Sequence, residues 1–99
     1  MRIITKSTLK NFWQKYPNSK NPLLAWYKIT SGSDWKNFSD VRQVFSSADM
    51  VGQLTVFNIG GNKYRLITKI AFATHKVYIR AVLTHTEYDK GNWKKDSWF

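Results

Sequence analysis

Residues 54–72, LTVFNIGGNKYRLITKIAF, carry the clearest structural signal in this chain. Two runs rich in β-branched and aromatic residues, Leu54–Ile59 and Lys63–Phe72, lie on either side of Gly60-Gly61. Such runs are typical of strands, and paired glycines accept the positive φ that a two-residue hairpin turn requires. A phosphate-binding loop would need further glycines at set spacing and a Lys-Ser/Thr ending, which this stretch lacks. We therefore predict an antiparallel hairpin.

Helical patterns occupy the residues before the hairpin. After a short β-prone segment at Met1–Ile4, apolar side chains recur at the i, i+3, i+4, i+7 spacing of one helix face. These positions are Leu9, Phe12, Trp13 and Tyr16 in a first helix that Pro17 ends, and Leu23, Trp26, Tyr27 and Thr30 in a second that Ser31-Gly32 ends. Ser39 can cap a third, shorter helix.

These elements predict an α+β fold for a single domain, residues 1–99. A further strand, Val77–Leu83, follows the hairpin after a loop at Thr74-His75 and completes an antiparallel meander. We expect the short N-terminal strand and the helices to pack on one face of this sheet. From about residue 90 the sequence is polar and basic, a composition that permits fraying.

The charge of the chain predicts a polyanionic partner. Lys and Arg number 16 against 6 Asp and Glu, which gives a formal net charge of +10. Nucleic acid is the first candidate, because the basic residues do not gather on one amphipathic helix as membrane binding would require. No segment approaches the roughly 20 apolar residues that span a bilayer, and the N-terminus lacks the pattern of a secretory signal. The expected location is therefore the cytoplasm.

The residue types also restrict the chemistry. The chain has no cysteine and 2 histidines, so thiolate chemistry is excluded and a transition-metal site is not expected. Catalysis would have to use His, Tyr, Lys, Arg or carboxylates, with no metal and no cofactor. The 16% of aromatic residues could stack on RNA bases, although small domains more often bury such side chains.

Side chains alternate across a strand, so one set faces the helices and the other faces away. The expected core set is Tyr64, Leu66, Ile70 and Phe72, with Val77, Ile79, Ala81 and Leu83 on the next strand. The opposite, basic face then holds Lys63, Arg65, Lys69, Lys76, Tyr78 and Arg80. If Thr74-His75 is a two-residue turn, Lys69 lies opposite Arg80 and Arg65 opposite Thr84.

Like charges directly across a sheet repel, and an anion can neutralise both. Neither central strand carries a carboxylate on this face, so we predict an anion-binding surface, with an ordinary solvated face as the alternative. Leu54, Val56 and Ile67 fall on the same side and make part of it apolar. An RNA base or another protein segment could cover them.

Proton-handling side chains follow the last strand at His85, Glu87, Tyr88 and Asp89. Cleavage of RNA by its own 2′-hydroxyl needs a base, an acid and cations for the charge that develops on the phosphate. Histidine exchanges protons near neutral pH, and arginine can hold a phosphate by two hydrogen bonds. We therefore expect this segment to act with the strand arginines. Glu87 and Asp89 could orient His85 or equally cap a terminal helical turn.

The same stretches resemble a known family. VFNIGGNKYRLI at 56–67, VYIRAVLTHTEYDK at 77–90, MRIITKSTLKNFW at 1–13 and AWY at 25–27 are similar to the HigB-type toxins of the RelE-like superfamily. The resemblance covers nearly the whole chain and implies a toxin that cleaves messenger RNA, in many members while the RNA occupies the ribosome. It also implies a HigA-type helix-turn-helix antitoxin as partner, with operator DNA bound only through that antitoxin.

The resemblance further implies roles for single residues. Arg65 matches the strand arginine used on the scissile phosphate, and Arg80 resembles a second basic position. His85, Tyr88 and Asp89 fall where the superfamily places its acid, base and stacking groups. The resulting prediction is Arg65, Arg80, His85 and Tyr88 as catalytic residues, and Lys63, Lys69, Lys76, Tyr78 and Asp89 as RNA-binding residues.

The leading hypothesis is thus a metal-independent endoribonuclease toxin. A non-catalytic RNA- or ribosome-binding module is the alternative, since it needs only the basic face and aromatic contacts. A third reading is an inactivated toxin homologue retained for operon control, which would bind its antitoxin without cleaving RNA.

Overall fold

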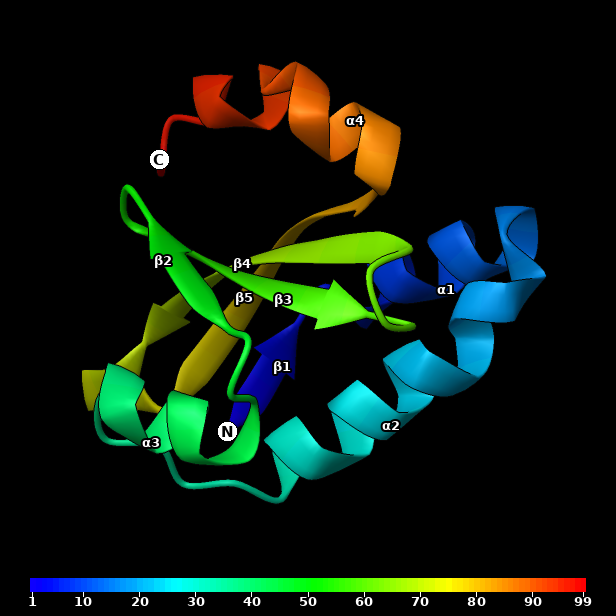
Figure 1. Ribbon diagram of the computed structural model, residues 1–99. Coiled ribbons are helices and arrows are strands. Elements are labelled where there is room, and N and C mark those ends of the chain that lie inside the picture. The colour runs from blue at the N-terminus through cyan, green and yellow to red at the C-terminus, as the bar shows by residue number, and fades with distance from the viewer.

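The strands are β1 (Arg2–Ile4), β2 (Asp49–Val51), β3 (Leu54–Ile59), β4 (Tyr64–Ala71) and β5 (Lys76–Thr84) in the computed structural model, which describes residues 1–99. They form one sheet in the order β1-β5-β4-β3-β2 (Figure 1). β3, β4 and β5 make the predicted antiparallel meander. The two-residue turn predicted at Gly60-Gly61 is wrong, because Ile59 pairs with Tyr64 and residues 60–63 lie between them. The sheet is nevertheless mixed, because β1 pairs parallel with β5, and β2 adds an outer strand that the sequence does not predict.

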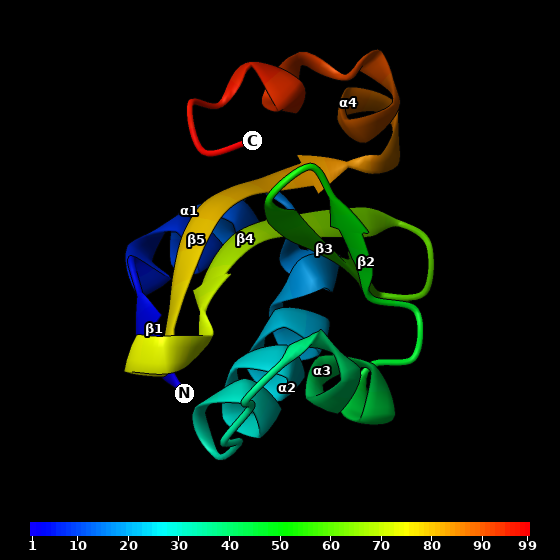
Figure 2. The ribbon, with the colours of Figure 1, turned by 90° about the vertical axis from the view of Figure 1, so that its left-hand side faces the viewer.

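The N-terminal helices are α1 (Lys6–Lys15), α2 (Lys20–Ser31) and α3 (Phe38–Val44), and they lie against one face of the sheet (Figures 1 and 2). All three predicted helices are confirmed. The cap of α3 is Asn37, whose side chain accepts a hydrogen bond from the Asp40 N–H at 3.0 Å, rather than Ser39. None of the helices combines the length and the apolar character that crossing a membrane needs.

The main core fills the space between these helices and the sheet. Leu9 of α1 and Trp26 of α2 pack there with Phe57 of β3, and each is at most 1% exposed. The side chains predicted to point inward from the second hairpin strand all belong to this core: Tyr64, Leu66, Ile70 and Phe72. The alternation expected along β4 is therefore confirmed.

The turn between β4 and β5 is longer than predicted. A 3₁₀ turn, Phe72–Thr74, is followed by His75 at a φ of 56°, and Ala71 pairs with Lys76. The additional residues shift the register of the two strands. The predicted pairs Lys69–Arg80 and Arg65–Thr84 are therefore wrong, and the observed pairs are Lys69–Tyr78 and Arg65–Leu83.

A β-bulge interrupts the same ladder at Arg80. Ile67 pairs with Ala81 and Thr68 pairs with Ile79, so Arg80 has no partner on β4. An unpaired residue reverses the side-chain alternation beyond it. The placement of Ala81 and Leu83 in the main core is therefore wrong: both lie on the opposite face, and Val82 takes the inward position.

The C-terminal part of the chain covers that opposite face with α4 (His85–Lys90) and a 3₁₀ turn, Asn92–Lys95 (Figure 2). A second apolar cluster forms beneath it from Leu54, Val56, Ile67 and Trp93, packed against Ala81, Leu83, Tyr88 and Phe99. An RNA base or a protein segment was expected to cover Leu54, Val56 and Ile67, and the chain's own C-terminal segment covers them.

The C-terminal segment, residues 91–99, packs on the rest of the protein, although its polar composition permits fraying. Trp93 is only 9% exposed, and the Gln53 N–H donates to the Phe99 carbonyl at 2.6 Å. The buried Trp93 side chain and the Phe99 backbone thus anchor a stretch whose remaining residues are mostly polar.

Trp93→Ala should lower the free energy of unfolding by about 3 kcal/mol, because it removes a buried indole and leaves the second cluster uncovered. Urea denaturation followed by circular dichroism measures the loss. Lys95→Ala is the control, since Lys95 is exposed in the same turn. Equal stability of the two variants would mean that this segment is not packed in solution.

Candidate active site

The transition from β5 to α4 places His85 at the start of a helix. The Thr84 hydroxyl accepts from the Glu87 N–H at 3.2 Å, and the Glu87 carboxylate accepts from the Thr84 N–H at 3.0 Å. This capping box stops the strand and begins the helix. The His85 N–H in turn donates to the Lys63 carbonyl at 3.1 Å, which ties the start of α4 to the β3–β4 turn.

His85, Tyr88 and Asp89 share one face of α4, because their spacing is i, i+3, i+4. The Nδ1 atom of His85 lies 2.9 Å from an Asp89 carboxylate oxygen. Both side chains are accessible, at 51% and 59% exposure. A carboxylate on Nδ1 fixes the tautomer of the ring and leaves Nε2 for a substrate. Two roles were considered for the acidic residues. Glu87 caps the helix, and Asp89 contacts His85.

Arg65 reaches this turn of α4 from the neighbouring strand β4. Its guanidinium carbon lies 5.4 Å from the centre of the Tyr88 ring. One terminal nitrogen donates to the carbonyls of Asn62 and Tyr64 at 3.1 and 3.2 Å, which holds the group in place. No carboxylate pairs with Arg65, so most of its donors are available to an anion.

Tyr88 is held against the second apolar cluster by Trp93. The two rings stack with their centres 5.1 Å apart, and the Trp93 indole N–H donates to the Tyr88 carbonyl at 3.0 Å. Burial raises the pKa of Tyr88 above its ordinary value, Asp49 and Asp89 raise it further, and Arg65 opposes them. The phenol therefore stays protonated at neutral pH and carries a proton that it can donate in a hydrogen bond.

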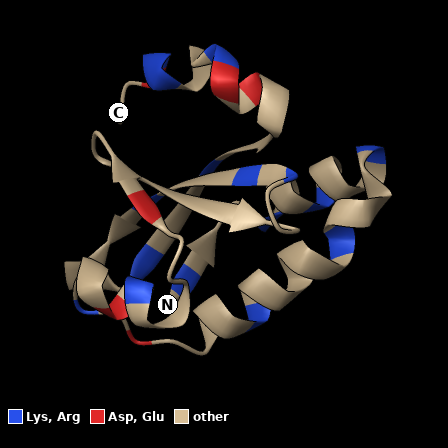
Figure 3. Cartoon of the chain, viewed as in Figure 1, with Lys and Arg blue, Asp and Glu red and all other residues tan.

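We call Arg65, His85, Tyr88 and Asp89 the Arg65–His85 cluster. Lys63 belongs beside it through its backbone bond to His85. The other predicted residues lie elsewhere on the same face of the sheet: Lys69 donates to the Gln53 carbonyl at 3.2 Å, Tyr78 packs on Trp98, and Lys76 lies at the far end, opposite Ala71. Lys and Arg are in fact spread over helices and strands alike (Figure 3).

Arg80 does not join the cluster. Two of its nitrogens donate to the two carboxylate oxygens of Asp96, both at 2.8 Å, and its guanidinium carbon lies 3.9 Å from the Trp98 ring centre. We call these three residues the Arg80 clamp. Arg80 projects to the same side of the sheet as Arg65. The residue that pairs with Arg65 is Leu83, and Arg80 lies three positions before it on β5. Three positions correspond to about 10 Å along a strand. Its predicted place on the phosphate is therefore not supported, because its charge is already paired with the Asp96 carboxylate.

No set of three or more His, Cys, Asp or Glu side chains gathers where it could hold a metal ion.

Comparison with known proteins now gives the family. Residues 19–91 match the family described as the RelE-like toxic component of a toxin–antitoxin system, HigB. The chain is 38% identical to the mRNA interferase toxin HigB of Escherichia coli K12 over 92 residues, which are 90% of this chain and 88% of that protein. This chain belongs to the HigB toxin family. It is also 38% identical to the mRNA interferase HigB of Shigella flexneri and 29% identical to that of Escherichia coli O6:H1, with similar coverage.

Reasoning from the sequence missed the side chains that build the walls of the site in this HigB-family protein. Trp93 stacks on Tyr88, while Asp96 and Trp98 both contact the Arg80 guanidinium. A signal was present: Trp93, Trp98 and Phe99 are too apolar for a free tail, and Leu54, Val56 and Ile67 needed a cover.

Asp96→Asn should lower the melting temperature by several degrees at pH 7, and the difference from wild type should shrink below about pH 4. The hydrogen bonds from Arg80 lower the pKa of Asp96, so its stabilising contribution exists above the ordinary carboxyl pKa and is lost as pH falls through the lowered value. Thermal unfolding at several pH values tests this. Asp49→Asn, which removes a carboxylate outside the Arg80 clamp, is the control, and a pH-independent difference would contradict the assignment.

Proposed function

We propose that this HigB-family protein is the toxin of a type II toxin–antitoxin system and that it cleaves messenger RNA at the Arg65–His85 cluster. The observation that carries the proposal is the meeting of an unpaired guanidinium, a carboxylate-bound imidazole and a protonated phenol around one turn of α4. The names of its relatives, mRNA interferases, support the same reading.

The proposed reaction is an attack of the ribose 2′-oxygen on the adjacent phosphorus. His85 takes the 2′-hydroxyl proton on Nε2 while Asp89 accepts from Nδ1 and stabilises the cation that forms. A bond from the 2′-oxygen to phosphorus forms, the bond to the 5′-oxygen breaks, and that oxygen receives a proton. The products are a 2′,3′-cyclic phosphate and a 5′-hydroxyl, so no water and no oxidant are consumed.

Arg65 and Tyr88 have complementary parts in this scheme. Arg65 donates to the phosphate oxygens as negative charge builds on them. Tyr88, neutral at physiological pH, either donates the proton to the leaving 5′-oxygen or stacks on a neighbouring base, in which case the His85 imidazolium supplies that proton. Its stacking on Trp93 fixes the ring beside Arg65 in either case.

The proposed partners follow from the same reaction. Messenger RNA in the cytoplasm is the substrate, and the formal charge of +10 favours cleavage of RNA associated with the ribosome, where phosphate density is high. A HigA-type helix-turn-helix antitoxin would neutralise the toxin and carry it to operator DNA.

Arg65→Ala should reduce kcat/KM for RNA cleavage by roughly 10²–10³-fold, because it removes the cation that meets the developing charge. The fold should persist, since Arg65 makes no side-chain ion pair. Cleavage of a message in a translation extract and growth after induction measure the effect. Arg42→Ala on α3 removes an equal charge from the helical side of the sheet and serves as the control. Full toxicity of Arg65→Ala at wild-type protein level would refute its role.

His85→Gln should reduce the cleavage rate at least about 10²-fold while leaving the affinity for a 2′-deoxy oligonucleotide nearly unchanged. The deoxy analogue cannot be cleaved, so its affinity reports binding alone. His75→Gln is the matched control, because His75 pairs with Asp34 at the other end of β5. A non-catalytic RNA-binding module would instead show no difference between the two histidine variants in any assay.

A further inference from the structure

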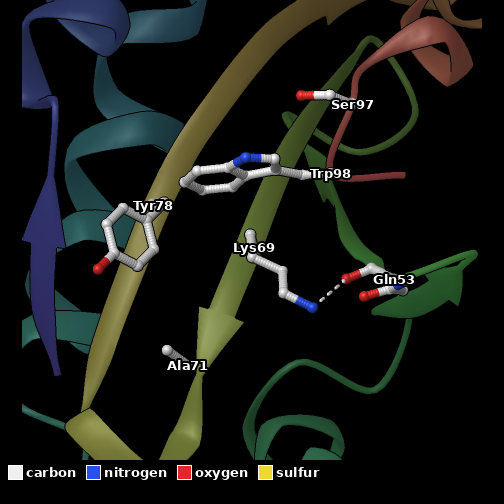
Figure 4. Close-up of a pocket in the computed structure, with 6 residues that line it drawn as sticks. All are labelled: Gln53, Lys69, Ala71, Tyr78, Ser97 and Trp98. Atoms are coloured by element: carbon white, nitrogen blue, oxygen red, sulfur yellow. Dashed lines mark hydrogen bonds between the residues drawn. The ribbon is translucent and has the colours of Figure 1, made fainter.

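A hollow lies on the same face of the sheet as the Arg65–His85 cluster, at the opposite end of β4 (Figure 4). Its volume is about 400 Å³, and its lining residues are Gln53, Lys69, Ala71, Tyr78, Ser97 and Trp98. Ser97 and Trp98 lie outside residues 19–91, so family membership does not imply this site. We call it the Trp98 pocket.

The Trp98 pocket combines an aromatic wall with a cation. Trp98 extends from the C-terminal segment towards Tyr78, and the ring centres are 5.3 Å apart (Figure 4). Trp98 is 39% exposed even though Arg80 lies against its ring. Aromatic surface left open in this way is unusual in a molecule that buries most of its tryptophans, and it can stack with a planar ligand.

Lys69 supplies positive charge at the base of the pocket. Its ammonium uses one donor on the Gln53 carbonyl at 3.2 Å and keeps two for a ligand. No carboxylate lines the pocket, and the nearest acidic residue along the chain, Asp96, is already neutralised by Arg80. The side chains that line the pocket therefore carry no negative charge.

We propose that the Trp98 pocket binds one nucleotide of the RNA substrate, a few positions along the strand from the scissile phosphate. The base stacks on Trp98, whose ring meets the Tyr78 ring edge to face, and Lys69 holds a phosphate. Lys69 and Arg65 lie on the same strand and the same face, four positions apart, which is about 13 Å. A single RNA strand lying along β4 thus reaches both places. This inference rests on the proposed nuclease function and adds a second contact point to it.

Three variants test the pocket on a fluorescent single-stranded 2′-deoxy oligonucleotide, with binding followed by anisotropy. Trp98→Leu should raise Kd about tenfold, the loss expected for one stacked base. Lys69→Gln should raise Kd severalfold and reduce the salt dependence of binding by about one counterion. Ala71→Leu fills the pocket without changing charge and should also raise Kd. Lys28→Gln, on the exposed side of α2, is the matched charge control and should bind like wild type.

The outcomes separate this inference from the proposed nuclease activity. If Lys69→Gln and Ala71→Leu bind as wild type while wild type cleaves RNA, the pocket assignment is overturned and the nuclease stands. If both weaken binding while wild type fails to cleave, the pocket stands and the nuclease falls. Free AMP offers the same base and phosphate, so tighter binding of AMP than of the oligonucleotide would overturn the assignment to an RNA strand. Weaker binding of the purified antitoxin alone, with oligonucleotide binding intact, would overturn it in favour of a protein contact.

Discussion

The bulge at Arg80 is the local constraint on which both faces of the sheet depend. One unpaired residue on β5 turns Ala81 and Leu83 away from the helices and towards α4. There they meet Ile67 and Trp93, so the face opposite the helices acquires an apolar floor of its own. Without the bulge, the alternation would continue, and Val82 and Thr84 would face this side in place of Ala81 and Leu83. Trp93 packs on this apolar surface, and Tyr88 stacks on Trp93. The position of the candidate catalytic phenol therefore depends on one irregular residue in a strand.

The two arginines on this face differ in the groups that contact their guanidinium, and this difference indicates a structural role for one and a chemical role for the other. Arg80 is met by a carboxylate through two hydrogen bonds and by an indole, so its charge is neutralised within the protein. Arg65 has two backbone carbonyls on one nitrogen and a neutral ring beside it, so its charge is oriented but not neutralised. A guanidinium in the second situation gains most from an incoming phosphate, because no existing ion pair has to be broken. The fold therefore uses one arginine to hold the C-terminal segment and leaves the other for an anion.

Local patterns were enough to predict the elements and part of the site. The spacing of Leu9, Phe12, Trp13 and Tyr16 and the strands around Gly60-Gly61 are decided within a few residues, and they appear as predicted. His85, Tyr88 and Asp89 also come together with Arg65, because helical spacing and strand adjacency bring them there. The bulge could not be predicted in this way, since Arg80 is fixed by Asp96, which lies 16 residues away and reaches it only once the C-terminal segment folds back. A strict alternation rule therefore misplaced Ala81 and Leu83, and the resemblance that assigned Arg80 to the phosphate gave no sign of its pairing with Asp96.

The openness of the Arg65–His85 cluster bears on how an RNA strand could be held. His85 and Asp89 are more than half exposed, and α4 is only a six-residue helix, so the cluster has no deep walls to orient a substrate. Rate enhancement by proton transfer requires the reacting atoms to be held in near-attack geometry. An extended polyanion can satisfy this requirement through contacts distant from the reacting phosphate, provided that they lie on the same rigid element. β4 is such an element, because it pairs on both sides and carries Arg65 near one end and Lys69 near the other. The C-terminal segment contributes to both ends of this strand, because Trp93 stacks on Tyr88 and Trp98 lines the pocket that contains Lys69. Asp96 anchors this segment to Arg80, so the positions of the two tryptophans are coupled.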